Sequence, residues 1–252
     1  MDRMIHTAFN SLKNIYDQRF RSANNLSNVN VPGFRRDLPD ESGSRNLSFD
    51  GMLSARSFSL ETGSSTFSAE EGNLNDTGVS TDVAIVGEGY FFIQPENGTV
   101  ALSRRGDLSI RADGILINGG SAEVLDRNLQ PITVPAFREF QVTHTGEILV
   151  DPIATPPGEF ISVGFIGATN PLQNTLFKDI DGQVRTESGD LPPVDTNVKI
   201  AQSMLEAANV NSVEELVNSM ELQRQFEISI KFISLAKELD EGGTQLMRMP
   251  EG

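Results

Sequence analysis

The chain offers few residues that could perform catalysis. Its two histidines, His6 and His144, lie far apart in the sequence, and it contains no cysteine. A Ser-His-Asp triad, a His-rich metal site, a disulfide and a thiolate nucleophile therefore lack their parts. Neither histidine is expected to be a catalytic base.

Two short motifs are better explained by turns than by ligand binding. Asp179-Ile180-Asp181-Gly182 begins like a calcium loop, but its glycine comes earlier than an EF-hand requires. Gly87-Glu88-Gly89-Tyr90 lacks the third glycine and the following helix of a nucleotide loop. We therefore expect a polar β-turn at the first motif and a tight turn into a strand at the second.

Scattered carboxylates leave one enzymatic alternative open. Asp107, Asp113 and Asp126 could include the acid/base pair of a glycosidase acting on cell-wall glycan, but no sequence feature sets two of them at the roughly 5–10 Å that this chemistry needs. Acidic residues outnumber basic ones 35 to 20, so a solvated surface is the default explanation. An acidic calcium-dependent binding module is a third possibility.

Composition narrows the choice of partners. The net charge of -15 would repel nucleic acid. No stretch approaches the roughly 18 apolar residues of a membrane span, and residues 1–10 lack the apolar core of a secretory signal. We expect no nucleic-acid binding, no membrane insertion and no cofactor.

The first element is an amphipathic helix from about Asp2 to Asn28. Its apolar residues recur mostly at spacings of three and four, which places them on one face. Asn28, Asn30 and Pro32-Gly33 then favour a turn and end the helix. The apolar face comprises Ile5, Phe9, Leu12, Tyr16, Ala23 and Leu26.

A second amphipathic helix is predicted near the C-terminus. Ser212 followed by Glu215 has the spacing of a capping box, and Ala201–Ala208 is expected to form a helical lead-in. Residues 1–36 carry more basic than acidic residues and residues 199–252 the reverse, which favours pairing of the two ends. The apolar stripe comprises Val213, Leu216, Met220, Phe226, Ile230, Ile233 and Leu239.

Between the helices, β-branched and aromatic runs alternate with turn residues, which is typical of an antiparallel β-domain. Asp113-Gly114 and Asn118-Gly119-Gly120 are hairpin turn signals. Residues 37–78 are expected to form an extended connector that packs mostly on its neighbours. On pattern alone, an ordinary α+β protein whose helices cover its own sheet is the simpler interpretation. The predicted strands are Val83–Val86, Tyr90–Gln94, Leu108–Arg111, Ile115–Asn118, Ile132–Val134, Phe140–Thr143, Ile148–Val150 and Phe160–Ile166.

Four segments favour a more specific interpretation. Ala23–Arg36 resembles the signature that ends the N-terminal helix in the bacterial flagellar rod and hook family, with Val31 in place of the usual Thr. Leu74–Ile93 resembles the entry to that family's β-domain, Ser103–Ser109 its first hairpin, and Leu205–Lys237 its C-terminal helix. The segments occur in the family's order and span nearly the whole chain.

The resemblance implies a non-enzymatic structural subunit of the flagellar basal-body rod. The length and the opening Met1–Ile5 are most like a proximal rod subunit, with the distal rod as the alternative. Such a subunit leaves the cytoplasm through the flagellar type III export apparatus without a cleaved signal peptide and lies in the rod, which crosses the periplasm. It assembles helically with itself and other rod subunits to transmit torque from motor to hook.

The expected fold is therefore α+β, with long N- and C-terminal helices pairing as a coiled coil and an inserted antiparallel β-domain. The expected divisions are 1–36 for the N-terminal rod helix and turn, 37–78 for the connector, 79–190 for the β-domain, and 191–252 for the hinge and C-terminal rod helix. Asn28, Pro32, Gly33 and Phe34 are expected to shape the turn that leaves the first helix. The expected assembly interface comprises Phe9, Leu12, Tyr16, Leu26, Leu216, Met220, Phe226, Ile230 and Ile233.

Overall fold

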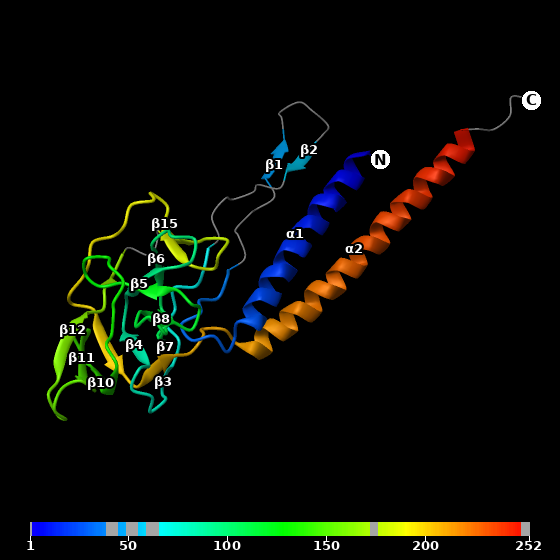
Figure 1. Cartoon of the computed structure of the whole chain (residues 1–252). Helices are drawn as coiled ribbons and strands as arrows, with labels where there is room; N and C mark the ends of the chain where they lie inside the picture. The colour runs from blue at the N-terminus through cyan, green and yellow to red at the C-terminus, as the bar shows by residue number, and fades with distance from the viewer. Residues whose placement is uncertain (1, 39–44, 49–54, 59–65, 172–175, 248–252) are drawn as a thin grey trace, which may run out of the picture. The chain divides into compact units, whose positions relative to one another are not determined.

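The computed structural model describes residues 2–38, 45–48, 55–58, 66–171 and 176–247. The chain divides into two compact units, and Figure 1 labels both helices and most of the strands. We call the first, made of residues 1–27, 37–63 and 211–252, the helical unit, and the second, made of 28–36 and 64–210, the β unit. Helices and antiparallel sheets together confirm the predicted α+β class.

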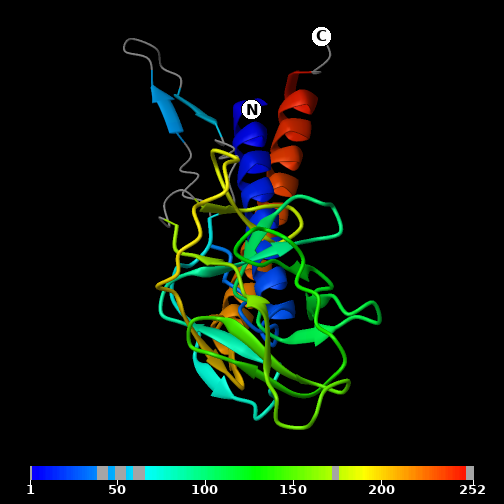
Figure 2. The ribbon, with the colours of Figure 1, turned by 60° about the vertical axis from the view of Figure 1, so that its left-hand side comes forward.

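The helical unit contains two long helices, α1 (Asp2–Ser27) and α2 (Ser212–Met247). Figures 1 and 2 show them side by side and running in opposite directions, with the end of α1 beside the start of α2. The predicted bounds of the first helix agree with α1, because its apolar spacing continues up to the turn-forming asparagines.

The start of α2 corrects the predicted capping box. The side chain of Asn211, not Ser212, accepts hydrogen bonds from the backbone amides of Val213 and Glu214, at 3.1 and 3.3 Å. Asparagine is among the best N-cap residues because its side-chain oxygen satisfies amides that have no partner within the helix. Glu215, the expected second member of the box, is instead buried and contacts α1.

Part of the expected connector forms paired strands. β1 (Arg45–Ser48) pairs antiparallel with β2 (Ala55–Phe58) in the helical unit. Farther along, β3 (Leu74–Asp76) pairs with β17 (Met204–Glu206) in the β unit. The segment therefore contains one strand pair of its own, and its last strand packs on a neighbouring strand.

The β unit is built from antiparallel sheets. The largest is eight-stranded, in the order β14-β15-β6-β5-β9-β8-β7, and β13 also pairs with β5. A three-stranded sheet has the order β10-β11-β12, and β16 pairs with β4. The bounds not yet given are β4 Val83–Val86, β5 Tyr90–Gln94, β6 Ala101–Ser103, β7 Leu108–Ile110, β8 Leu116–Asn118, β9 Glu123–Val124, β10 Phe137–Val142, β11 Glu147–Pro152, β12 Ile161–Phe165, β13 Ala168–Thr169, β14 Leu176–Lys178, β15 Val184–Thr186 and β16 Lys199–Gln202.

Two sequence predictions fail in this unit. Ala201–Ala208 is not a helical lead-in, because β16 and β17 occupy it and Ser203 between them has a left-handed φ of 59°. Pairing with β4 and β3 overrides the helix-favouring alanines and leucine. Ile132–Val134 forms only isolated bridges, such as Ile115 with Thr133.

The hydrophobic core of the β unit is built around strands such as β4 and β5, which carry consecutive buried apolar residues. Phe92 and Ile93 of β5 and Leu116 of β8 are completely buried. The largest core cluster draws on β4, β5, β7 to β13 and β16, so one core holds these strands together. Its members include Val83, Ile85, Phe91, Leu108, Leu116, Val124, Phe140, Ile148, Val150, Ile166, Val198 and Ile200.

The two turn motifs behave as predicted. Gly87 and Gly89 have φ values of 83° and 136° in the turn that enters β5. In the motif between β14 and β15, Gly182 has a φ of 77° and donates its amide to the carbonyl of Asp179. Arg185 pairs with both aspartates of this motif, at 2.8 Å to Asp179 and 2.6 Å to Asp181, so these carboxylates serve a turn.

The other carboxylates considered for chemistry have separate structural partners. Asp107 pairs with Arg105 and Asp113 pairs with Arg111. Asp126 accepts amide hydrogen bonds in its own turn. Within the described ranges, no group of three acidic or histidine side chains is arranged to hold a metal ion, and neither α1 nor α2 is apolar enough along a sufficient length to cross a bilayer.

The Asp181–Arg185 pair predicts a pH-dependent contribution to stability. The hydrogen bond from Arg185 lowers the pKa of Asp181 below its ordinary value of 3.8. A carboxyl whose pKa is lower in the folded than in the unfolded state stabilises the fold above the unfolded pKa, and this contribution is lost as the pH falls. Asp181→Asn should therefore destabilise the chain by about 0.5–1 kcal/mol near neutral pH and by less below about pH 3.

Thermal unfolding followed by circular dichroism, near neutral pH and below about pH 3, measures the loss of stability in Asp181→Asn at each pH. Asp190→Asn, in the exposed turn after β15, is the control and should change the melting temperature little at either pH. An equal loss at both pH values in Asp181→Asn would show that the carboxylate charge is not what matters.

Candidate functional site at the helix-exit segment

The segment that follows α1, Asn28–Arg36, makes a tight turn within the β unit. The amide of Val31 donates to the carbonyl of Asn28 at 3.0 Å, and the amide of Phe34 donates to the carbonyl of Val31 at 3.2 Å. Pro32 lies inside this turn, where its fixed φ is tolerated and its missing donor costs nothing. We call these residues the helix-exit segment.

Gly33 is packed directly against the β unit. Its φ is +67°, and a Cβ at this position would lie 2.4 Å from both the carbonyl carbon and the carbonyl oxygen of Arg104. Its amide donates to the carbonyl of Glu206 at 2.8 Å. Backbone conformation and the lack of space therefore both require glycine here.

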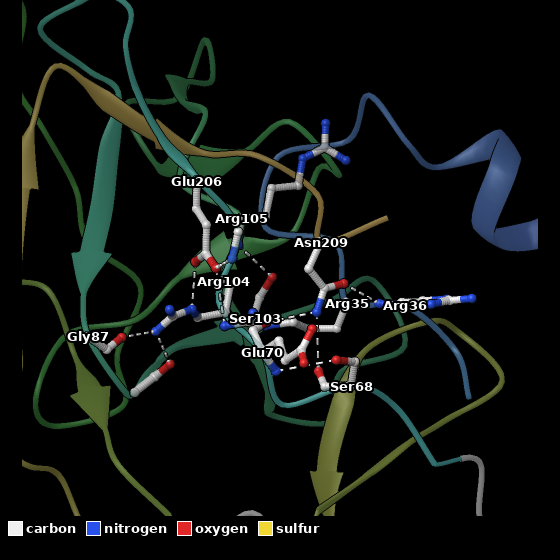
Figure 3. Close-up of polar contacts among 12 residues, drawn as sticks. Arg35, Arg36, Ser68, Glu70, Gly87, Ser103, Arg104, Arg105, Glu206 and Asn209 are labelled. Atoms are coloured by element: carbon white, nitrogen blue, oxygen red, sulfur yellow. Dashed lines mark hydrogen bonds and ion pairs between the residues drawn. The ribbon is translucent and has the colours of Figure 1, made fainter. Parts of the chain in front are cut away.

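A buried carboxylate lies beside this glycine. Glu206, at the end of β17, pairs with Arg104 at 2.7 Å through one oxygen and with Arg35 at 3.1 Å through the other. All three side chains are at most 5% exposed. Figure 3 shows the polar contacts of this group, which we call the Glu206 cluster (Arg35, Arg104 and Glu206).

Each member of the Glu206 cluster is anchored further by backbone groups. Arg104 donates to the carbonyls of Gly87 and Gly89 at 2.7 and 2.9 Å. Arg35 donates to the carbonyl of Glu70, and the amide of Gly72 donates to the Glu206 carboxylate. Burial of charge is costly unless such partners are present, so the cluster ties together five segments that are separate in the sequence.

The charges of the Glu206 cluster do not cancel. Burial lowers the pKa of Arg35, the charge of Glu206 opposes that effect, and the charge of Arg104 adds to it. One carboxylate thus faces two guanidinium groups, and the site retains positive character.

Two further residues, Asn209 and Lys178, hold the helix-exit segment. Asn209 accepts from the amide of Arg36 at 2.6 Å, donates to the carbonyl of Glu70 at 2.7 Å, and gives its own amide to the carbonyl of Phe34. The ammonium group of Lys178, in β14, lies 3.8 Å from the centre of the Phe34 ring and donates to the carbonyl of Arg35 at 3.1 Å. A cation over an aromatic face is a favourable arrangement.

In the helical unit, a separate polar group joins the end of α1 to the start of α2. Ser22 donates to the Glu215 carboxylate at 2.8 Å, and Asn25 donates to the same carboxylate at 3.2 Å. Asn25 also binds both backbone groups of Asp37. Ser22, Asn25 and Glu215 are all buried, and together they set which residues of the two helices face each other.

The expected interface residues divide into two sets. Leu12, Leu26, Phe226 and Ile233 are half-buried, and Arg19 lies 5.1 Å from the centre of the Phe226 ring. The remaining expected residues, Phe9, Tyr16, Leu216, Met220 and Ile230, are exposed in the single chain.

Burial follows a regular spacing on α2, and five residues of α1 share that spacing, although Asn14, Asp17, Arg21, Asn24 and Asn25 of α1 are also half-buried or buried. On α2 the less exposed residues recur alternately at three and four, which is the spacing of one face of a helix that contacts another. These positions are Glu215, Ser219, Leu222, Phe226, Ser229, Ile233 and Ala236 on α2, with Leu12, Ile15, Arg19, Ser22 and Leu26 on α1.

Sequence reasoning from residue types missed the Glu206 cluster. Charges in an acidic chain are normally solvated, so nothing in the pattern marked Arg35, Arg104 or Glu206 as buried. A signal was nevertheless present. All three residues lie inside segments quoted for the family resemblance, as do Asn25 and Asn209. The segments that resemble the family meet at this site and at the polar group of the helices.

Comparisons with known proteins agree with the resemblance. The family model described as "Flagellar hook protein FlgE/F/G D1 domain" matches residues 84–150, which include Arg104. The model described as "Flagellar basal body rod FlgEFG protein C-terminal" matches residues 201–246, which include Glu206 and α2.

Individual relatives match over most of their length. The flagellar basal-body rod protein FlgF of Salmonella typhimurium is 26% identical over 255 residues, covering 99% of this chain and 100% of that protein. FlgF of Caulobacter vibrioides is 30% identical over 227 residues, covering 88% and 89%. FlgG of Buchnera aphidicola subsp. Baizongia pistaciae is 32% identical over 241 residues, covering 86% and 89%.

The fit of Gly33 against Arg104 predicts a large effect of a single methyl group. Gly33→Ala should destabilise the chain by about 3 kcal/mol or more, because it adds a clash to a strained φ. Gly78 has the same φ of +67° but open space around its Cβ position, so Gly78→Ala should cost only about 1–2 kcal/mol. Urea unfolding followed by circular dichroism measures both, and equal losses would contradict the packing argument.

The Glu206 cluster predicts a similarly large loss of stability when its carboxylate is removed. Glu206→Gln keeps the shape of the side chain but leaves two buried guanidinium groups without a counter-charge, which should cost about 3–5 kcal/mol. Glu123→Gln, which weakens the exposed pair with Arg111, is the matched control and should cost less than about 1 kcal/mol. The same unfolding measurement applies, and a Glu206→Gln variant as stable as the control would refute the role of the charge.

Proposed function

Because the chain belongs to the flagellar basal-body rod protein family, we propose that it is a structural subunit of the bacterial flagellar rod. The observation that carries this proposal is the likeness to named rod proteins over nearly the whole chain, including 30% identity to a FlgF over 88% of it. The comparisons give no support to a glycan-cleaving enzyme, since the matched relatives are named as rod proteins.

A place in the proximal rod is the finer proposal. The relatives that cover 99% of this chain and 100% of their own length are named FlgF, and FlgF is the proximal rod protein. The distal rod is the alternative, because FlgG relatives also match at comparable identity.

For assembly, we propose that α1 and α2 pair as an antiparallel coiled coil. The regular spacing of the half-buried residues supports this pairing. The apolar residues left outside the pair would then contact adjacent subunits. Contacts between different surfaces of successive subunits generate a helix in place of a closed ring. The exposed set comprises Phe9, Tyr16 and Phe20 on α1 and Val213, Leu216, Val217, Met220, Ile228, Ile230, Phe232, Leu235 and Leu239 on α2.

The remaining parts of the proposal follow from this arrangement. Buried helix contacts would carry torque from motor to hook, while the acidic β-domain keeps a hydrated surface. The subunit would reach the rod through the flagellar type III export apparatus, without a cleaved signal peptide, and would act in the part of the basal body that crosses the periplasm.

Quantitative mass spectrometry of purified hook and basal-body complexes tests the function. The chain should be present in a fixed ratio to other rod subunits. A handful of copies would support the proximal rod and a clearly larger number the distal rod. Absence from intact complexes would overturn the structural function.

The apolar surface of α2 gives a mutational prediction. Ile230→Asp should abolish rod incorporation and swimming, because a charge would be buried without a partner at a subunit contact. The purified variant should unfold within a few degrees of the parent, since Ile230 is 47% exposed in the single chain. Asn218→Asp adds the same charge at an exposed polar position of α2 and is the control, with normal motility expected.

Phe226→Asp separates the two surfaces of α2. Phe226 is half-buried within the helical unit, so this variant should lose both assembly and thermal stability. Normal swimming of the Ile230→Asp strain, with the variant present in its basal bodies, would remove Ile230 from the interface.

A further inference from the structure

A cavity of about 220 Å³ opens beside the helix-exit segment. All of its walls belong to the β unit. One wall is the helix-exit segment itself, a second comes from β5, β6 and the residues after β6, and the third is the hairpin of β14 and β15. The volume is well above the roughly 30 Å³ share of one water in the liquid, so a side chain fits inside.

The lining is rich in cations. Arg35, Arg104, Arg105 and Lys178 line the cavity, and Asp181 is the one acidic residue among its described lining residues. Asp181 already pairs with Arg185, and Arg105 pairs with Asp107. Since Glu206 supplies one negative charge to two guanidinium groups, the wall formed by the Glu206 cluster keeps an excess of positive charge.

Arg35 adds a second observation. Its side chain is 5% exposed, and its Nε is a buried donor that has no hydrogen-bond partner within the described part of the chain. Buried donors in proteins almost always have an acceptor. The guanidinium group of Arg35 thus keeps unused hydrogen-bonding capacity, and it belongs to a cavity lining whose further cations suit a carboxylate.

The rest of the lining suits the stem of a side chain. Val31, Pro32, Phe34, Leu102 and Val184 present apolar surface in the same cavity. An acidic side chain has this combination of apolar methylene groups and a charged end.

We propose that this cavity receives an aspartate or glutamate side chain of an adjacent rod subunit. The inference rests on the proposed function, which supplies a neighbouring subunit. Charge complementarity selects the occupant, because the chain has a net charge of -15 and a subunit of similar composition presents many carboxylates. Docking at this cavity would couple the helix-exit segment of one subunit to the surface of the next.

Site-specific photocrosslinking in assembled rods tests the contact. Gln183, a half-buried lining residue between β14 and β15, is replaced by benzoylphenylalanine in the full chain, and basal bodies are purified and irradiated. The expected product joins this position to a peptide of another rod subunit that contains Asp or Glu. The same probe at Ile180, which is fully exposed on the same hairpin and does not line the cavity, is the control and should give at least fivefold less of that product.

The role of the carboxylate is tested in the identified partner. Changing its acidic residue to the amide should reduce the yield of crosslink several-fold, and an unchanged yield would overturn the proposal. Crosslinks confined to the same chain, or equal yields from Gln183 and Ile180, would also overturn it. If the chain is missing from basal bodies, the proposed function fails; if it is present without the crosslink, only this inference fails.

A free anion is the competing occupant. The purified chain is melted in sodium acetate, sodium succinate and sodium sulfate, each matched in ionic strength with sodium chloride. We expect shifts in melting temperature below about 1 °C, because a free carboxylate lacks the effective concentration of a docked subunit. A rise of more than about 3 °C would indicate a site for small anions and would overturn docking by a subunit.

Discussion

The position of the helix-exit segment depends on one buried interaction, the carboxylate of Glu206 between the guanidinium groups of Arg35 and Arg104. Three charges withdrawn from water are tolerated only when each has partners in good geometry. Each therefore fixes the others, and the backbone groups that anchor them cannot move independently. The lasting effect of such a cluster is a single defined path for the chain more than net stability. A well-packed apolar group of similar volume could supply similar free energy.

Backbone geometry supports the same path by independent means. The segment turns at Gly33, whose conformation and close approach to Arg104 exclude any side chain. Asn209 holds the next residues through two hydrogen bonds, to Phe34 and Arg36, and a third bond ties it to the carbonyl of Glu70. The charges of the Glu206 cluster, the left-handed backbone of Gly33 and the side-chain amide of Asn209 therefore specify one conformation together. This segment is the covalent link from α1 into the β unit.

The sequence predicted what local pattern controls. Periodicity located α1, α2, β4 and β5, and turn chemistry located the ends of several strands. It failed at Ala201–Ala208, where pairing with distant strands decides the structure, and at the start of α2, where Asn211 displaces the expected cap. Glu215 could not be assigned to Ser22 because 193 residues separate them. The burial of the Glu206 charge could not be predicted from the sequence pattern either, since it depends on segments that only the fold brings together.

The two helices carry two distinct sets of side chains, buried polar residues and exposed apolar ones. Ser22, Asn25 and Glu215 are buried and hydrogen-bonded, so a shift of one helix along the other would leave a carboxylate unpaired; they fix the register. Met220, which is 68% exposed, belongs to a large apolar surface that is not buried in the single chain and so adds little to its stability. Water disfavours such a surface, and burying it against neighbours would supply the affinity. Polar contacts thus set the register within the single chain, and burial of the exposed apolar surface would supply free energy for the proposed assembly.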